Sequence, residues 1–151
     1  SLFKLFMSDT GLLCASCMEN IQFDILNGNL GINLGSILEN VMAQQLKSNG
    51  FQLRYFDNNK YGEVDFVIQS GMSAKLVEIK SGNDYKKHKA LDNVRYVDEW
   101  SFESCTVFCK GNIELSDGVF YLPWYMIMFM LPDKPPTVFK HEIDLSVLNS
   151  I

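Results

Sequence analysis

The stretch that decides the fold runs from Tyr61 to Lys80 and reads YGEVDFVIQSGMSAKLVEIK. Apolar and polar residues alternate on both sides of its centre, which is typical of two β-strands that each bury one face. Gly71 occupies the first of two central positions, where a type II′ hairpin turn prefers glycine. The stretch therefore predicts a β-hairpin whose two-residue loop is Gly71 and Met72.

This loop determines which residues face one another across the hairpin. Asp65 should face Glu78, and Glu63 should face Lys80. Directly opposed residues share one face of a sheet, so these four charged side chains should project to the same side. The same register pairs Val67 with Leu76 and Ser70 with Ser73, and it places Val64, Phe66, Ile68, Val77 and Ile79 on the other side.

Three carboxylates beside one ammonium group are unfavourable unless a cation compensates them, because opposed like charges destabilise a sheet. Mg²⁺ takes oxygen ligands, commonly one or two carboxylates and several waters. Asp65 and Glu78 are therefore the candidate ligands of Mg²⁺ (or Mn²⁺), with Lys80 beside the metal-bound water. The alternative is a solvated charged face on which Glu63 and Lys80 form a cross-strand salt bridge.

A further acidic residue, Glu39, lies on a predicted amphipathic helix at residues 36–49. It borders the apolar face of that helix and could reach over the sheet toward Asp65. The alternative is a capping box, in which Ser36 begins the helix and Glu39 bonds back to its start. The apolar stripe of this helix consists of Leu38, Val41, Met42 and Leu46.

The remaining elements are predicted from local patterns. We expect strands at 2–7, 51–55, 104–110, 113–115 and 119–122, and helices at 12–26, from Asn83 or Asp84 onward, and from Pro123. Residues 27–31 and 57–60 should be loops, and residues 132–151, which contain three prolines, are interpreted as a tail or an arm.

The clustered positive charge of the chain follows the proposed metal-bearing strand directly. It consists of Lys86, Lys87, Lys89 and Arg95. Lysines at this place could neutralise the phosphates of a nucleic acid without reading its sequence. The alternative is a solvated helix face, on which His88 would be exposed rather than catalytic.

Composition sets limits on function. The chain has 151 residues, which suits one domain, and a net charge of −5, which argues against a surface coated with basic residues for nucleic acid. Any contact with a polynucleotide should then be local. The sequence contains no phosphate-binding loop of the form G-x-x-x-x-G-K-[ST], so we expect no ATP binding by these residues.

Location is also predicted from the sequence. Residues 2–7 lack the flanks of a signal peptide, and the apolar run at 119–131 is shorter than the ~20 residues of a membrane span. We therefore expect a cytoplasmic protein without membrane contact. The chain begins with Ser1 rather than Met, which indicates part of a longer protein.

Four cysteines form two short-spaced pairs, Cys14 with Cys17 and Cys105 with Cys109. Four thiolates could close a zinc or iron–sulfur site. The favoured interpretation is that Cys105 and Cys109 lie in a buried strand, where free cysteine behaves as a small apolar residue.

An acidic residue on a helix, then Asp65, a hairpin and Glu78-x-Lys80, resembles the signature of the PD-(D/E)XK nuclease superfamily. Four segments are similar to one branch, a domain of unknown function found C-terminal to AAA-type ATPase modules in bacteria and archaea. These segments are KLFMSDTGLL at 4–13, LGSILENVMAQQL at 34–46, EVDFVI at 63–68 and VEIKSGNDYKKHKALDNV at 77–94.

The resemblance implies an α/β domain with a restriction-endonuclease-like core, a central mixed β-sheet flanked by helices. The nuclease-like domain would span residues 1–125, a C-terminal helix or tail would follow at 126–151, and an N-terminal ATPase module would precede them. The implied activity is Mg²⁺-dependent phosphodiester hydrolysis of nucleic acid. Asp65, Glu78 and Glu39 would hold the metal, and Asp65, Glu78 and Lys80 would form the catalytic set.

A different class of function also fits the sequence. The acidic net charge, the modest basic cluster and the apolar run at 119–131 are compatible with a catalytically inactive recognition or docking module of the ATPase. The sequence does not indicate the oligomeric state.

Overall fold

A computed structural model of the protein describes residues 3–17, 23, 27 and 34–133. Its elements in chain order are α1 (Thr10–Cys17), α3 (Leu34–Ser48), β1 (Phe56–Asn58), β2 (Gly62–Val64), β3 (Phe66–Ser70), β4 (Ser73–Ile79), α4 (Lys89–Arg95), β5 (Phe102–Cys109), β6 (Glu114–Ser116), β7 (Val119–Pro123) and the 3₁₀-helix η1 (Trp124–Phe129).

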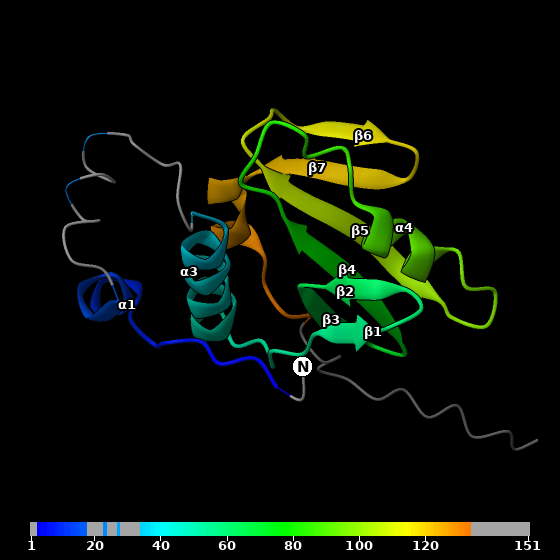
Figure 1. Cartoon of the computed structure of the whole chain (residues 1–151). Coiled ribbons are helices and arrows are strands. Elements are labelled where there is room, and N and C mark those ends of the chain that lie inside the picture. The colour runs from blue at the N-terminus through cyan, green and yellow to red at the C-terminus, as the bar shows by residue number, and fades with distance from the viewer. Residues whose placement is uncertain (1–2, 18–22, 24–26, 28–33, 134–151) are drawn as a thin grey trace, which may run out of the picture.

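The centre of the fold is a five-stranded mixed sheet in the order β3-β4-β5-β7-β6 (Figure 1). The strands β4, β5 and β7 run parallel, and β3 and β6 are antiparallel strands at the two edges. The predicted α/β class with a central mixed sheet flanked by helices is therefore confirmed. A separate two-stranded sheet pairs β1 with β2.

The predicted hairpin is present as β3 and β4. Its register runs from Phe66 opposite Val77 to Ser70 opposite Ser73, with Gly71 and Met72 as the loop. The φ angle of Gly71 is +55°, in the region that glycine adopts without steric cost. Local turn chemistry and alternation thus determined this pairing correctly.

Each face of the large sheet packs against a different set of elements. On one face, side chains of α3 and η1 meet Phe66, Val77 and Phe108 in a buried cluster. On the other face, Leu91 and Val94 of α4 pack with apolar residues of the sheet and of the β1–β2 hairpin. Helices thus cover both faces (Figure 1).

The first strand of the predicted hairpin differs from the expectation because it is interrupted at Asp65. Residues 62–64 pair with β1, so Glu63 lies opposite Asp57 rather than Lys80. Val64 is buried in the cluster under α4, not with Phe66 under α3. The alternative of a salt bridge between Glu63 and Lys80 was therefore wrong, since Glu63 pairs with Lys4, and Lys80, which follows the end of β4, pairs with Glu78.

Other boundaries also differ from the prediction. The expected strand at 51–55 is not a strand, and residues 56–58 pair instead, because the turn that closes this hairpin comes later, at 59–61. Residues 3–7 form no strand. The part of the expected first helix after Cys17, most of the loop at 27–31 and the tail at 134–151 lie outside the described residues.

The second long helix begins later than expected, at Lys89 rather than Asn83 or Asp84. Before it, the backbone N–H of Lys87 donates to the carbonyl of Asp84, forming a turn that delays the helix. The segment after Pro123 is a 3₁₀-helix. None of the helices in the described part of the chain combines the length and the apolar character needed to cross a membrane.

Gly62 provides a test of the packing between β2 and α4. Its φ is +98°, and a Cβ placed on it would lie 2.8 Å from Cβ of Ala90. We expect Gly62→Ala to lower the free energy of unfolding by roughly 3 kcal/mol through strain and overpacking. Gly71→Ala is the matched control, because its φ is also positive but no atom lies within 4 Å of the added Cβ; about 1 kcal/mol is expected there. Urea denaturation measures both, and equal losses would contradict the close approach.

Candidate functional site

Asp65 lies at the bend between β2 and β3, where the interrupted strand passes from the small sheet to the large one. Its Oδ2 accepts a hydrogen bond of 2.7 Å from the backbone N–H of Ile79, the last residue of β4. This bond holds the carboxylate at the end of β4 from which the Glu78-x-Lys80 segment leaves the sheet. Most of the Asp65 side chain is buried.

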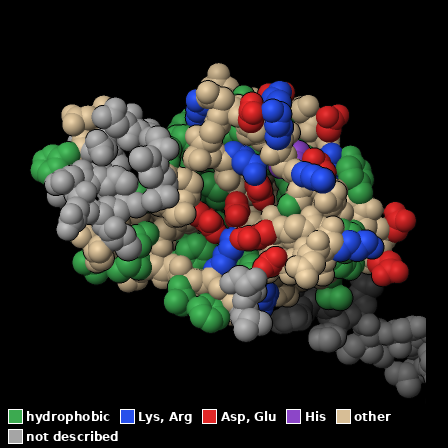
Figure 2. Space-filling model, viewed as in Figure 1, with side chains coloured by type: hydrophobic (Ala, Val, Ile, Leu, Met, Phe, Trp, Pro, Cys, Tyr) green, Lys and Arg blue, Asp and Glu red, His purple; other side chains and the backbone are tan. Residues whose placement is uncertain are grey.

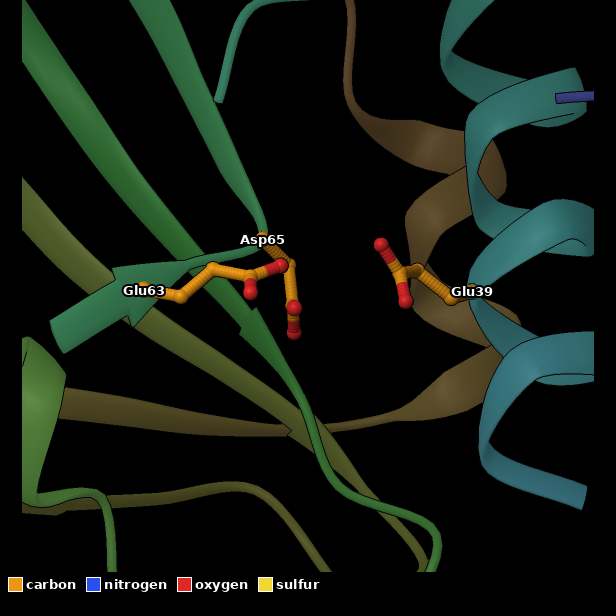
Figure 3. Close-up of side chains that lie close together, drawn as sticks. All are labelled: Glu39, Glu63 and Asp65. Atoms are coloured by element: carbon orange, nitrogen blue, oxygen red, sulfur yellow. The ribbon is translucent and has the colours of Figure 1, made fainter. Parts of the chain in front are cut away.

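Two further carboxylates lie beside Asp65. Glu39 extends from α3 toward the sheet, and Glu63 extends from β2 (Figure 3). One oxygen atom from each of the three side chains lies within 4.8 Å of the others. In the part of the chain that the structure describes, these are the acidic, histidine or cysteine residues close enough to share one metal ion. We call Glu39, Glu63 and Asp65 the acidic triad.

Lys4 places its ammonium group among these three carboxylates. Its Nζ lies 2.7 Å from Oε1 of Glu39 and 3.6 Å from Oδ1 of Asp65, and it also forms an ion pair with Glu63. Burial disfavours the charged lysine, but the hydrogen bonds to Glu39 and Glu63 outweigh this effect and raise the pKa of Lys4 above its ordinary value. Lys4 therefore carries its full charge inside the site.

Glu78 and Lys80 complete the surroundings of Asp65 from the β4 side. Nζ of Lys80 lies 2.7 Å from Oε1 of Glu78, whose side chain is only 8% exposed. The other oxygen, Oε2, is buried and has no hydrogen-bond partner among the described residues. The backbone of Lys80 is fixed by its own N–H, which donates to Phe108, and by Nε1 of Trp124, which donates to its carbonyl.

The electrostatics of Asp65 reflect this crowding. Burial is the largest cause that raises its pKa, the negative charge of Glu78 is the next, and Glu39 adds to both. The N–H of Ile79 and the charge of Lys4 oppose them, and the resulting pKa is about 7 instead of 3.8. Of the residues that the sequence singled out, Glu78 and Glu39 thus act on the charge of Asp65, and Lys80 is paired with Glu78. Glu78 lies outside the group of described carboxylates whose oxygen atoms could share one ion.

The capping-box interpretation of Glu39 was wrong. The helix begins at Leu34, so Ser36 lies inside its first turn and is not the residue before it. The Glu39 side chain is directed to Lys4 instead of the helix start. Of the predicted apolar stripe, Met42 and Leu46 are buried, whereas Val41 is 41% exposed.

The predicted basic cluster is largely paired with acids. Lys86 contacts Glu114 at 2.6 Å, Lys87 contacts Asp84 at 2.8 Å, and Arg95 contacts Asp92 at 3.1 Å. Lys89 is exposed at the start of α4. Figure 2 shows the consequence, since basic and acidic side chains alternate above the acidic group at the middle of that face. The net positive potential is smaller than the sequence suggests.

His88 is buried, with 6% of its surface exposed, so the expectation of an exposed histidine was wrong. Its Nε2 lies 2.6 Å from the hydroxyl oxygen of Tyr121, and its Nδ1 lies 3.0 Å from a carboxylate oxygen of Asp92. The contact with Tyr121 fixes the start of α4 to β7. Sequence offered no signal for it, because Tyr121 lies on a distant strand.

Two residues of the site were missed by sequence reasoning. Glu63 was recognised as part of the acidic face but was assigned to Lys80. Lys4 was noted only inside a family-like segment, although it is the one charged residue between Leu2 and Ser8. An isolated charge in an apolar segment is a signal that could have indicated an internal ion pair.

The cysteines occupy separate places. Cys105 and Cys109 are buried on β5, as the buried-strand interpretation predicts, and burial raises the pKa of both thiols, which disfavours the thiolate needed for zinc. Cys14 lies on α1, and the side chain of Cys17 is outside the described residues.

The raised pKa of Asp65 predicts a specific dependence of stability on pH. The folded state holds an extra proton between pH 3.8 and about 7, so the free energy of unfolding should fall as the pH rises through that interval. Asp65→Asn removes the titrating carboxyl group and therefore this loss of stability at high pH. We expect its melting temperature to exceed that of the wild type by roughly 3–6 °C at pH 8 and by about 1 °C or less at pH 4.

The exposed Asp98 provides the control, because Asp98→Asn should change the melting temperature equally at both pH values. Thermal scans followed by circular dichroism measure these differences. A constant effect of Asp65→Asn across the range would contradict the buried, crowded carboxylate.

Comparison with known proteins places this site within a family. No curated protein and no solved structure matches the chain. Residues 34–127 match a protein family described as a domain of unknown function, DUF4143. The match includes Glu39, Glu63, Asp65, Glu78 and Lys80, and it covers more than half of the chain. The chain therefore belongs to the DUF4143 family.

Proposed function

We propose that this domain hydrolyses phosphodiester bonds in nucleic acid with the help of Mg²⁺ (or Mn²⁺). The observation that carries the proposal is the position of Asp65. It is buried between Glu78 on β4 and Glu39 on α3, and Glu78 in turn contacts Lys80. Buried carboxylates that repel one another and raise a pKa to about 7 are typical of a site prepared for a cation.

The residues present fit a hard divalent ion. All the donor atoms are carboxylate oxygens, which Mg²⁺ and Mn²⁺ prefer. The buried Oε2 of Glu78 has no hydrogen-bond partner in the described part of the chain, and such an atom is costly unless a ligand satisfies it. Asp65 and Glu39 would hold the ion, and Glu63 has an oxygen within 4.8 Å of theirs. Glu78 lies outside that group and would join them as a ligand through its unpaired Oε2.

Lys80 would act on the attacking water and on the phosphate. Its ammonium group is held by Glu78 at 2.7 Å, and its backbone is fixed on both sides, so the side chain is positioned in advance. A positioned cation of this kind stabilises the negative charge that develops on a scissile phosphate. When bound, Mg²⁺ would supply Lewis-acid polarisation of the phosphoryl oxygen and lower the pKa of the water.

The fold is compatible with this chemistry. A mixed sheet covered by helices on both faces, with the acidic residues at a hairpin next to a parallel strand, fits a restriction-endonuclease-like core. The chain order of the proposed site residues supports membership in the PD-(D/E)XK nucleases, because a glutamate on a helix, Glu39, is followed by Asp65, Glu78 and Lys80. We extend the proposal to an AAA-type ATPase module elsewhere in the full protein, to which this domain would be attached.

Contact with the nucleic acid would be local. The basic residues that would make this contact follow β4 in the chain and extend to the end of α4. They are Lys86, Lys87, Lys89 and Arg95. Three of them are already paired with carboxylates, so phosphates would have to exchange with Asp84, Asp92 or Glu114. Such exchange predicts weak binding with a strong dependence on salt.

Cleavage assays test the proposal directly. Purified protein with Mg²⁺ or Mn²⁺ should cut DNA or RNA, and Glu78→Gln or Lys80→Met should each reduce the rate by at least ~100-fold. Glu99→Gln is the matched control, because Glu99 is an exposed glutamate outside the site. Each variant should retain the wild-type circular dichroism spectrum.

Cleavage that persists unchanged in Glu78→Gln and Lys80→Met would indicate a contaminating nuclease and contradict the proposal. The absence of cleavage in the wild type, together with the absence of Mn²⁺ binding that depends on Asp65, would contradict it as well.

The second candidate function is docking to the ATPase module without catalysis. Its support is a group of exposed apolar side chains near β6, β7 and η1. Leu115 on the edge strand β6 lies opposite Phe120 on β7, and they are 63% and 41% exposed. The exposed residues Met128, Phe129 and Leu131 follow. Calorimetric titration with Mn²⁺ separates the two functions, because docking requires no metal at Asp65 and Glu78.

A further inference from the structure

The segment Phe3–Ser8 covers the acidic triad, and Lys4 is the residue that enters it. The Lys4 side chain is 16% exposed although the neighbouring Leu5 is 85% exposed. Its ammonium group contacts all three acids of the triad. A positive charge from the chain itself thus lies where a divalent cation would have to contact Glu39 and Asp65.

We infer that Lys4 is an internal counter-cation, which a divalent metal ion must displace from the acidic triad, so that the segment Phe3–Ser8 inhibits the site until it moves. This inference rests on the proposed function and concerns the regulation of the same site. It would make metal binding and movement of the segment one coupled event.

The contacts of the segment indicate where it would pivot. The side chain of Asn40 holds Met7 on both sides, since Oδ1 accepts from the N–H of Met7 at 2.8 Å and Nδ2 donates to its carbonyl at 3.1 Å. Nδ2 also donates to Oγ1 of Thr10. These bonds fix the chain after Lys4, so Met7 is the point about which residues 3–6 can turn.

The space around the segment leaves room for such a movement. A cavity of about 480 Å³ borders it and is also lined by Tyr55 and Asp65. Another of about 300 Å³ borders it as well and is also lined by Glu39 and Asn40 of α3. Phe6 also contacts the core through Phe66, with ring centroids 5.6 Å apart.

Charge compensation explains why one cation excludes the other. The triad carries up to three negative charges, and Lys4 neutralises part of them at hydrogen-bond distance. Mg²⁺ needs oxygen atoms at 2.0–2.1 Å in octahedral geometry. An ammonium group bound to the same oxygen atoms repels a divalent ion and uses the lone pairs that the ion requires.

Two measurements test the inference. The first compares Mn²⁺ affinity in wild type, Lys4→Gln and the control Lys60→Gln, whose exposed lysine lies in the β1–β2 turn away from the triad. Calorimetry should give at least ~10-fold tighter binding in Lys4→Gln only, and Asp65→Asn should abolish it. The second follows acetylation of Lys4 in the wild-type protein by mass spectrometry. Lys4 should react slowly without metal and several-fold faster with saturating Mn²⁺, while Lys60 should not change.

The outcomes separate the inference from the proposed function. Equal Mn²⁺ affinity in wild type and Lys4→Gln, with Lys4 still protected in the metal-bound protein, would overturn the inference and leave the metal site standing. If neither protein binds Mn²⁺ in a manner that depends on Asp65, the proposed function fails, and the inference fails with it. If Lys4→Gln does not fold, as judged by circular dichroism, Lys4→Met and the acetylation of the wild type decide.

Discussion

The hydrogen bond from the N–H of Ile79 to the carboxylate of Asp65 is the constraint on which the site depends. It ties the bend between β2 and β3 to the end of β4, and this bend divides what the sequence presents as one strand. Because of the bend, Val64 packs under α4 while Phe66 packs under α3. The chain thereby crosses from one face of the sheet to the other at the residue with the most perturbed carboxylate.

Charge compensation follows from that placement. A carboxylate held in this position is desolvated and lies near Glu39 and Glu78, so the surrounding structure has to supply positive charge or protons. Lys4 supplies it to Asp65 from the N-terminal segment, and Lys80, the residue after β4, supplies it to Glu78. Under the proposed function, a metal ion would therefore compete with Lys4 for the same carboxylates.

The sequence predicted what is local and missed what is distant. The β3–β4 register followed from the Gly71-Met72 loop, and α3 followed from the spacing of Met42 and Leu46, because both signals lie within a few residues. The type and order of residues singled out Glu39 and Asp65, two members of the acidic triad, whereas the third member, Glu63, was assigned to Lys80. The isolated charge of Lys4 could have indicated an ion pair, but no local pattern could identify its partner Glu39, 2.7 Å away and 35 residues further along the chain. The burial of His88 was missed for the same reason, since its partner Tyr121 is 33 residues away.

The strand order also has a consequence for how the domain assembles. The β3–β4 hairpin closes through a two-residue loop, whereas β4 meets its parallel neighbour β5 only after the chain has traversed α4. Closing a short loop costs less chain entropy, so the hairpin should be the earliest part of the sheet to form during refolding. Asp65 would then be in place before β5 and Lys4 arrive, and the newly formed protein would pass through a stage in which its acidic pocket is still open to solvent.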